Sequence, residues 1–153
     1  MSEIKFKNTR FNPDVIPFHG LAKEMAKAVG YTADLDVDKK LAQLLRLRVA
    51  QKNECAYCVI LHSNASRDIG ISSAKTDNIS SWYNSELYTD IEKVALAYCD
   101  VLTDGKSKEF QSYHDALTTH FNEKEIAEIA AIIINMNVWT RLKLAQGETP
   151  FQE

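Results

Sequence analysis

The chain has few residues that interrupt helices: five glycines and three prolines in 153 residues. With 45% hydrophobic and 25% charged residues, the composition lies in the globular range and excludes the disordered and fibrous classes. The sequence contains no internal repeat, no low-complexity tract and no linker rich in glycine, serine or proline. A chain of this length buries roughly 70% of its unfolded surface, so we predict one domain over residues 1–153.

Long apolar runs and runs of one charge sign are also absent. The most apolar segment, residues 129–139, is shorter than the roughly 20 residues that a membrane span requires. The net charge is −3, and no lysine or arginine run offers a phosphate-binding stripe. The first residues mix charges with apolar side chains and lack the continuous apolar region of a signal peptide. We therefore expect no nucleic acid or membrane partner, and a cytoplasmic location.

Apolar residues recur at three- and four-residue steps along most of the chain, and no segment shows the sustained alternation of a strand. Thr89 with Glu92 and Asn122 with Glu125 form capping boxes that begin two helices. The acidic run 34–38 suits the first turn of another, because negative charge is favourable at a helix N-terminus. Helices are predicted over about residues 18–29, 39–51, 55–69, 73–79, 90–104, 107–120 and 123–145. The sequence therefore predicts an all-α bundle.

Cysteine is scarce, with three residues, and two of them lie close together in the segment NECAYCVILHS. Because helical residues advance by about 100° each, Cys55, Cys58 and His62 share one face, and Cys58 and His62, four apart, are expected to touch. A helix N-terminus and a nearby imidazolium lower a thiol pKa from about 8.5 to about 7 or below. One thiol can then attack, the other can resolve by forming a disulfide, and His62 can shuttle the proton. Cys99 stands apart and is expected to be a packing residue.

Other interpretations of this pair remain open on spacing alone. A thioredoxin-like site requires a βαβ context that the sequence lacks. A structural zinc site needs more ligands than the pair offers, because His19, His114 and His120 are scattered, and we predict no metal and no cofactor. The cysteines can also be core residues beside a satisfied buried histidine, since cysteine is among the most buried residue types.

Three blocks of sequence resemble one family: LLRLRVAQKNECAYCVILHSNASRDIG, EKVALAYCDVLTD and FNEKEIAEIAAIIINMNVWTRLKLA. Together they are similar to the carboxymuconolactone decarboxylase family, specifically its alkylhydroperoxidase D-like branch, over about residues 11–145. The resemblance implies an all-helical fold and a homo-oligomer, commonly a trimer or hexamer. It also implies a cysteine pair that reduces hydroperoxides with electrons from a dithiol donor such as a lipoylated protein. Decarboxylase members lack the C-x-x-C pair, so lactone decarboxylation does not match.

The resemblance further implies a proton relay between His62 and a glutamate, but the position twelve residues before the first cysteine holds Gln43. A glutamine cannot accept the proton, although its amide can still orient the ring. Glu54 stands where the family often has glycine, and its carboxylate either raises the pKa of Cys55 or lies in solvent. We predict a thiol-dependent peroxidase or disulfide oxidoreductase in which Cys58 attacks, Cys55 resolves and Gln43 supports His62. The alternative is a non-catalytic helical oligomer whose cysteine pair is redox-sensing or structural.

Five more residues near these blocks are expected to have structural roles. Arg46 and Arg48 can hold a carboxylate, but a solvated or interface position is the favoured expectation. Trp139 and Arg141 are expected to serve packing and an ion pair rather than chemistry. Tyr57, between the cysteines, is expected at the entrance of a pocket.

Overall fold

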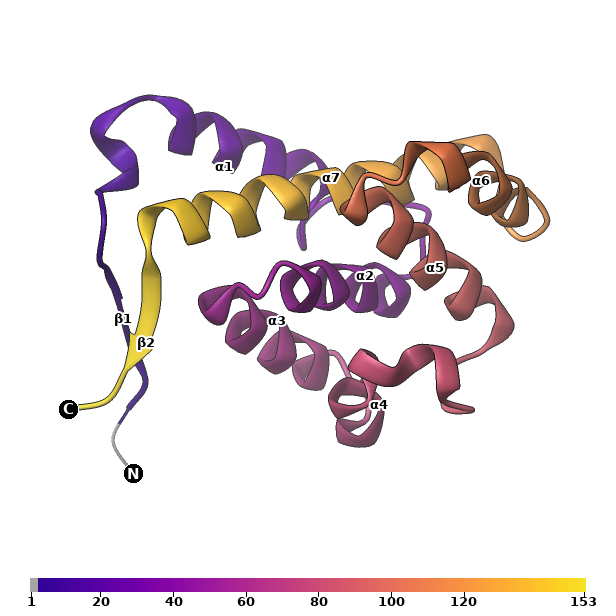
Figure 1. Cartoon of the computed structure of the whole chain (residues 1–153), viewed down its shortest axis with the longest axis horizontal. Coiled ribbons are helices and arrows are strands. Elements are labelled where there is room, and N and C mark those ends of the chain that lie inside the picture. The colour runs from indigo at the N-terminus through magenta and orange to yellow at the C-terminus, as the bar shows by residue number, and fades with distance from the viewer. Residues whose placement is uncertain (1–2) are drawn as a thin grey trace.

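The computed structural model describes residues 3–153, and these residues form the predicted all-α bundle with one small sheet (Figure 1). The α-helices are α1 (Phe18–Val29), α2 (Lys39–Lys52), α3 (Ala56–Asp68), α4 (Ser73–Asp77), α5 (Asp90–Asp104), α6 (Phe110–Thr118) and α7 (Glu123–Gln146). The 3-10 turns are η1 (Pro13–Val15), η2 (Ile79–Asn84) and η3 (Ser107–Glu109), and the strands are β1 (Lys5–Asn8) and β2 (Glu148–Phe151). Within residues 3–153, no helix has both the length and the apolar content that crossing a bilayer requires.

The predicted helix ends are largely confirmed. Both capping boxes are present, at Thr89 for α5 and at Asn122 for α7, and Gly105 ends α5 in the left-handed conformation that glycine favours. The acidic first turn predicted for α2 is wrong, because the helix begins at Lys39 and the acidic residues precede it. Only Asp38 touches the helix end, where its carboxylate accepts a hydrogen bond from the Leu41 N–H.

The two-stranded sheet was not predicted from the sequence. β1 and β2 pair antiparallel, with Lys5 opposite Phe151 and Asn8 opposite Glu148, so the two ends of the chain lie side by side (Figure 1). Four residues a strand are too few for an alternation pattern to be recognised. The sheet packs against the start of α3, where the rings of Phe6 and Tyr57 meet edge to face at 4.9 Å.

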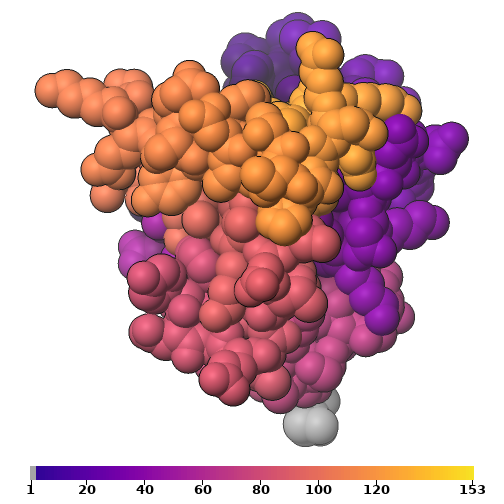
Figure 2. Space-filling model, turned by 90° about the vertical axis from the view of Figure 1, so that its right-hand side faces the viewer, coloured from indigo at the N-terminus to yellow at the C-terminus, as the bar shows by residue number. Residues whose placement is uncertain are grey.

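Helix α2 lies inside the bundle and contacts α3, α5 and α7. Its apolar residues, such as Leu44 and Leu45, are buried, and so are the polar residues Gln43 and Arg46. In Figure 1, α2 runs between α7 and α3. Seen from the end opposite the sheet, α6 and the start of α7 lie above α5 (Figure 2). Helix α2 is therefore enclosed by other helices. Its buried polar side chains must form hydrogen bonds within the protein, because they do not reach solvent.

Candidate active site

Cys55 and Cys58 lie at the N-terminus of α3 and form a disulfide, with their Cα atoms 5.2 Å apart. Cys55 is the N-cap residue, and its sulfur accepts a hydrogen bond from the Cys58 N–H at 3.2 Å. The turn from α2 into α3 places Glu54 at φ 53°, a left-handed conformation that favours glycine. The Glu54 side chain is exposed, so of the two positions considered for its carboxylate, the structure has the one in solvent.

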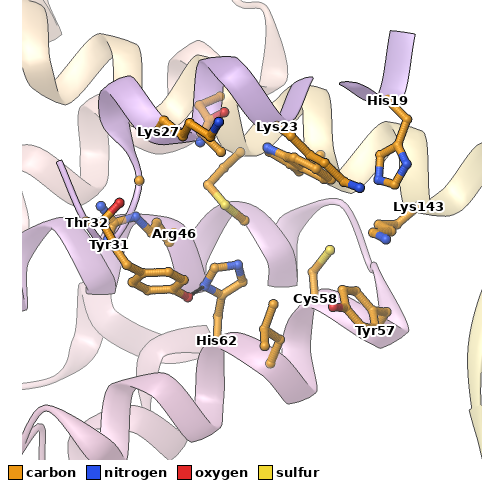
Figure 3. A pocket seen from close by; sticks show the side chains of 16 residues that line it. His19, Lys23, Lys27, Tyr31, Thr32, Arg46, Tyr57, Cys58, His62 and Lys143 are labelled. Atoms are coloured by element: carbon orange, nitrogen blue, oxygen red, sulfur yellow. Dashed lines mark hydrogen bonds between the residues drawn. The ribbon is translucent and has the colours of Figure 1, made fainter. Parts of the chain in front are cut away.

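Only one of the two sulfurs faces open space. Cys58 lines a cavity of about 530 Å³ formed by residues of α1, α2, α3 and α7, and Cys55 is not among the lining residues. Both cysteines are almost fully buried, Cys55 at 1% and Cys58 at 2% exposed, so what distinguishes them is that only Cys58 lines the cavity. Figure 3 shows Cys58 and His62 side by side on one wall of this cavity, as their shared helical face predicts.

His62 is buried, and its hydrogen-bond partner is not the one expected. The Nδ1 atom is bonded to the hydroxyl of Tyr31, and the two rings stack with their centroids 5.6 Å apart. Within residues 3–153 no hydrogen bond joins His62 to Cys58, whose sulfur is engaged in the disulfide. In this oxidised form, Tyr31 is therefore the group that holds the His62 ring, and a direct interaction of His62 with the Cys58 thiol remains a prediction for the reduced form.

Sequence reasoning missed Tyr31, which stands 31 residues before His62 and belongs to no motif. It follows Gly30, the residue that ends α1. A Cβ atom at Gly30 would collide with the carbonyl oxygen of Ala26, so glycine allows the chain to turn sharply there. Tyr31 is 51% exposed on its outer side while its hydroxyl reaches inward to the histidine. It therefore connects the buried His62 ring with solvent.

Gln43 lies beside His62, as expected, but its amide nitrogen points at the histidine. The Nε2 group donates to the His62 carbonyl oxygen at 3.0 Å and to Ser66 Oγ at 3.3 Å, and lies 3.4 Å from His62 Nδ1. Its Oε1 faces Arg46 Nη1 at 3.4 Å. Turning the amide over would set Oε1 against the His62 carbonyl, two acceptors in contact. Gln43 thus cannot accept a hydrogen bond from the Nδ1–H group, whereas the Tyr31 oxygen can.

Burial controls the protonation states in this cluster. Desolvation, together with the positive charge of Arg46, lowers the pKa of His62 to about 3. Desolvation also raises the pKa of Tyr31, so its hydroxyl stays neutral. A neutral imidazole has one proton to place. If Nδ1 donates that proton to the Tyr31 oxygen, Nε2 is free to accept a proton from the cavity.

Replacing Tyr31 by phenylalanine is expected to slow the reaction of the Cys58 thiol by about tenfold or more. Without the hydroxyl, the Gln43 amide N–H is the remaining neighbour of Nδ1, which makes Nδ1 the acceptor and leaves Nε2 protonated. Alkylation rates of the reduced protein as a function of pH measure this effect. Thr32→Ala, a cavity change at the next position, serves as the control, and equal pH profiles for wild type and Tyr31→Phe would contradict the role.

The structure confirms some of the structural roles expected for individual residues and contradicts others. Tyr57 lines the cavity, as predicted, and Trp139 lines it too, with its ring edge to face with His19 at 5.6 Å. Arg141 is exposed and has no ion pair within residues 3–153, so that expectation was wrong. Cys99 is fully buried, and burial raises its pKa, which confirms a packing residue.

Of the two positions expected for Arg46 and Arg48, solvated or at an interface, the solvated one is wrong for both. Arg48 makes two hydrogen bonds to Asp100, at 2.7 and 3.0 Å, which also accepts from the Trp82 indole at 3.1 Å. Arg46 is 5% exposed. Their helix α2 is surrounded by other helices, so neither side chain reaches the surface freely. Among residues 3–153 there is no group of three or more histidine, cysteine or acidic side chains placed to hold a metal.

The fold and the site define a helical-bundle protein with a C-x-x-C pair at the start of a helix and a histidine one turn later. The model of the carboxymuconolactone decarboxylase family matches residues 19–100, and the chain belongs to this family.

Two curated relatives are similar in sequence. The uncharacterized protein YdfG of Bacillus subtilis is 28% identical over 119 residues, which cover 76% of this chain and 80% of YdfG. The uncharacterized protein YnjA of Escherichia coli is 27% identical over 109 residues, covering 71% of this chain and 60% of YnjA. Each alignment therefore leaves part of this chain and part of the relative unmatched.

Solved structures share the fold. A protein of unknown function from Agrobacterium tumefaciens, named as a candidate antioxidant defence protein AhpD, superposes with a TM-score of 0.81 at 27% identity, over 92% of this chain and 96% of its own. A peroxidase-related protein from Ralstonia eutropha with an alkylhydroperoxidase AhpD core has a TM-score of 0.78 at 18% identity, over 92% of this chain and 72% of its own. The debrominase Bmp8 also shares the fold, with a TM-score of 0.70 at 20% identity, over 89% of this chain and 70% of its own. The chain therefore has the AhpD-like helical fold.

Proposed function

We propose that this protein is a thiol-dependent peroxidase that reduces organic hydroperoxides through the Cys55/Cys58 pair. The observation that carries the proposal is the arrangement of the two sulfurs: Cys58 faces a cavity beside His62, and Cys55 lies behind it within bonding distance. An attacking thiol needs access to substrate, whereas a resolving thiol needs access only to its partner. The antioxidant and peroxidase names of structurally similar proteins agree with this assignment.

The oxidative half of the cycle uses three side chains. His62 Nε2 relays the proton of the Cys58 thiol while the sulfur attacks the outer oxygen of the hydroperoxide. Because burial keeps the pKa of His62 low, the ring passes the proton on in the same step instead of holding it. The O–O bond breaks, the substrate is reduced by two electrons, and the alkoxide leaves as an alcohol with the proton from His62. Cys58 is then a sulfenic acid, which the Cys55 thiol attacks to form the disulfide and release water.

The reductive half requires a dithiol donor, which supplies two electrons and two protons and becomes a disulfide itself. A lipoylated protein is the donor we propose, and a homo-oligomer, a trimer or hexamer, is the assembly. Exposed apolar side chains along α1 and at its start, such as Val15, Phe18 and Leu21, suit a surface that another copy covers. A cytoplasmic location suits a cycle that must return to the reduced form, because that compartment keeps thiols reduced.

Peroxide consumption tests the proposal directly. Wild-type protein given cumene hydroperoxide and excess dihydrolipoamide is expected to consume many equivalents of peroxide per chain, with a rate that depends on the donor. Cys99→Ser is the matched control, because Cys99 is buried away from the cavity and its variant should retain the activity. Consumption that stops near one equivalent per chain, with donor still present, would contradict a peroxidase.

The same measurement separates the second candidate, a non-catalytic oligomer with a redox-sensing cysteine pair. The observation that favours it is the Gln43 amide, which presents a donor to His62 where a relay needs an acceptor. A sensor would form the disulfide once with peroxide and then remain oxidised. The two functions therefore differ in the number of equivalents consumed rather than in whether the disulfide forms.

A further inference from the structure

The cavity in front of Cys58 is lined by basic side chains and by no acidic one. Of the lining residues, all within the described part of the chain, four are lysine or arginine, Lys23, Lys27, Arg46 and Lys143, and two are histidines, His19 and His62. Figure 3 shows His19, Lys23 and Lys27 of α1 across the cavity from Cys58 and His62 of α3. A low-dielectric hollow lined by one sign of charge attracts ligands of the opposite sign.

Two of these lysines, and the histidine His19, already have carboxylate partners inside the protein. The pairs are Lys27–Glu24 at 2.8 Å, Lys143–Glu148 at 2.6 Å and His19–Asp14 at 2.7 Å. Lys23 and Arg46 have no such partner among residues 3–153. Lys23 is exposed, and water solvates its charge. Arg46 is different, because its guanidinium is almost fully removed from solvent.

Arg46 is 5% exposed and its polar neighbours are uncharged. Its Nη2 donates to the Val29 carbonyl oxygen at 3.3 Å, its Nη1 reaches Gln43 Oε1 at 3.4 Å, and the guanidinium lies 4.7 Å from the centre of the Tyr31 ring. Its buried Nε has no hydrogen-bond partner. A buried cation without a carboxylate is costly, and a guanidinium does not lose its proton to relieve that cost. The buried guanidinium of Arg46 therefore has no anion within residues 3–153 to balance its charge.

We propose that Arg46 binds a carboxylate of the small organic molecule that reacts at Cys58. The inference rests on the proposed function and names its substrate class: an amphiphilic molecule with a carboxylate at one end and the reacting group at the other. Leu61, Met136 and Trp139 of the same cavity offer an apolar surface for its body. Arg46 forms two parallel hydrogen bonds to a carboxylate more readily than to any other group, and Lys23 adds attraction at the cavity edge.

A purely structural role is the competing explanation, in which Arg46 only caps the C-terminus of α1 at Val29 and stacks on Tyr31. Such a role would not make Cys58 prefer an anionic reagent over a neutral one. Iodoacetate and iodoacetamide provide that comparison, because they are nearly equal in size and transfer similar groups to a thiolate. Their rate ratio at Cys58, divided by the ratio for N-acetylcysteine, isolates the contribution of the cavity.

The experiment uses Cys55→Ser protein, in which Cys58 is the thiol that lines the cavity and Cys99 is fully buried away from it. We expect the normalised ratio to favour iodoacetate by about tenfold, as one desolvated charge-assisted pair allows. Arg46→Gln should reduce it to near one, and Gln43→Glu should do the same by giving Arg46 an internal carboxylate. Lys27→Gln, which removes a cation already paired with Glu24, is the matched control and should leave the ratio unchanged within about twofold. A wild-type ratio near one would overturn the proposal.

Two further arms identify the molecule that carries the carboxylate. The oxidant arm compares cumene hydroperoxide with its para-carboxylate, and the reductant arm compares dihydrolipoate with dihydrolipoamide. Arg46→Gln should raise KM about tenfold for the acid in one arm, leaving kcat and the neutral compound unaffected. If no KM changes in either arm, the substrate assignment is wrong. If neither hydroperoxide is turned over while iodoacetate is still preferred, the peroxidase proposal fails and the anion site stands.

Discussion

Replacing Cys58 by serine is expected to abolish peroxide reduction, whereas Cys55→Ser protein is expected to complete one reaction per chain and then stop. The reason is the position of the two cysteines, since both are almost fully buried but only Cys58 lines the cavity. Removing the attacking thiol should lower the rate of the first reaction by roughly a thousandfold or more, because serine at neutral pH offers no comparable nucleophile.

The measurement is peroxide consumed per chain without any donor, combined with dimedone trapping of sulfenic acid. Cys55→Ser should consume one equivalent and be labelled at Cys58, because no resolving thiol remains. Wild type should consume one equivalent and end as the unlabelled disulfide. A single equivalent consumed by Cys58→Ser, with label on Cys55, would reverse the assigned order of attack.

The oxidised protein is expected to lose stability as the pH falls from about 6.5 towards 3, with His62 as one cause. Burial lowers the pKa of His62 from 6.5 to about 3 in the folded state, so in this window the unfolded chain binds a proton that the folded chain does not. Stability therefore rises with pH across the window and is fully present above it. At 1.36 kcal/mol per pH unit, this one group contributes a loss of about 3 kcal/mol between pH 7 and pH 4.

Urea unfolding at a series of pH values measures this loss. Acidic residues also destabilise proteins on protonation, so the informative quantity is the difference between wild type and His62→Gln. Glutamine does not titrate and can keep a hydrogen bond to Tyr31. The free energy of unfolding of the variant should therefore fall less steeply with falling pH, by up to the roughly 1.36 kcal/mol per pH unit that one proton contributes. If the free energies of unfolding of the two proteins changed in parallel with pH, His62 would have the same pKa in the folded and unfolded states, which would contradict the prediction.

The helices could be predicted because their signals are local. The capping boxes at Thr89 and Asn122 and the stop at Gly105 act within a few residues of the chain, and the structure confirms each of them. The sheet could not be predicted, since Lys5 and Phe151 pair across nearly the whole length of the sequence. Pairing of that kind depends on where the bundle brings the two ends of the chain.

In the candidate site, too, the local features could be predicted from the sequence and the long-range ones could not. The C-x-x-C-x-x-x-H spacing predicted that Cys58 and His62 share a face, and both line one cavity. The burial of Arg46 was not predicted, because its helix has polar residues on faces that only the surrounding helices cover. Tyr31 had no sequence signal at all, and its position depends on the turn at Gly30.

By itself, the sequence determined the class of fold, the family and the cysteine pair with its histidine, because periodicity, caps and spacing act over short distances along one helix. Only the tertiary structure decided which sulfur faces the cavity, which group holds His62 and which charge lacks a partner. Those properties depend on packing between residues distant in the sequence: α1 brings Tyr31 to α3, and the enclosed α2 carries Arg46 beside both. Burial then sets their protonation and makes an unpaired guanidinium costly enough to indicate a ligand.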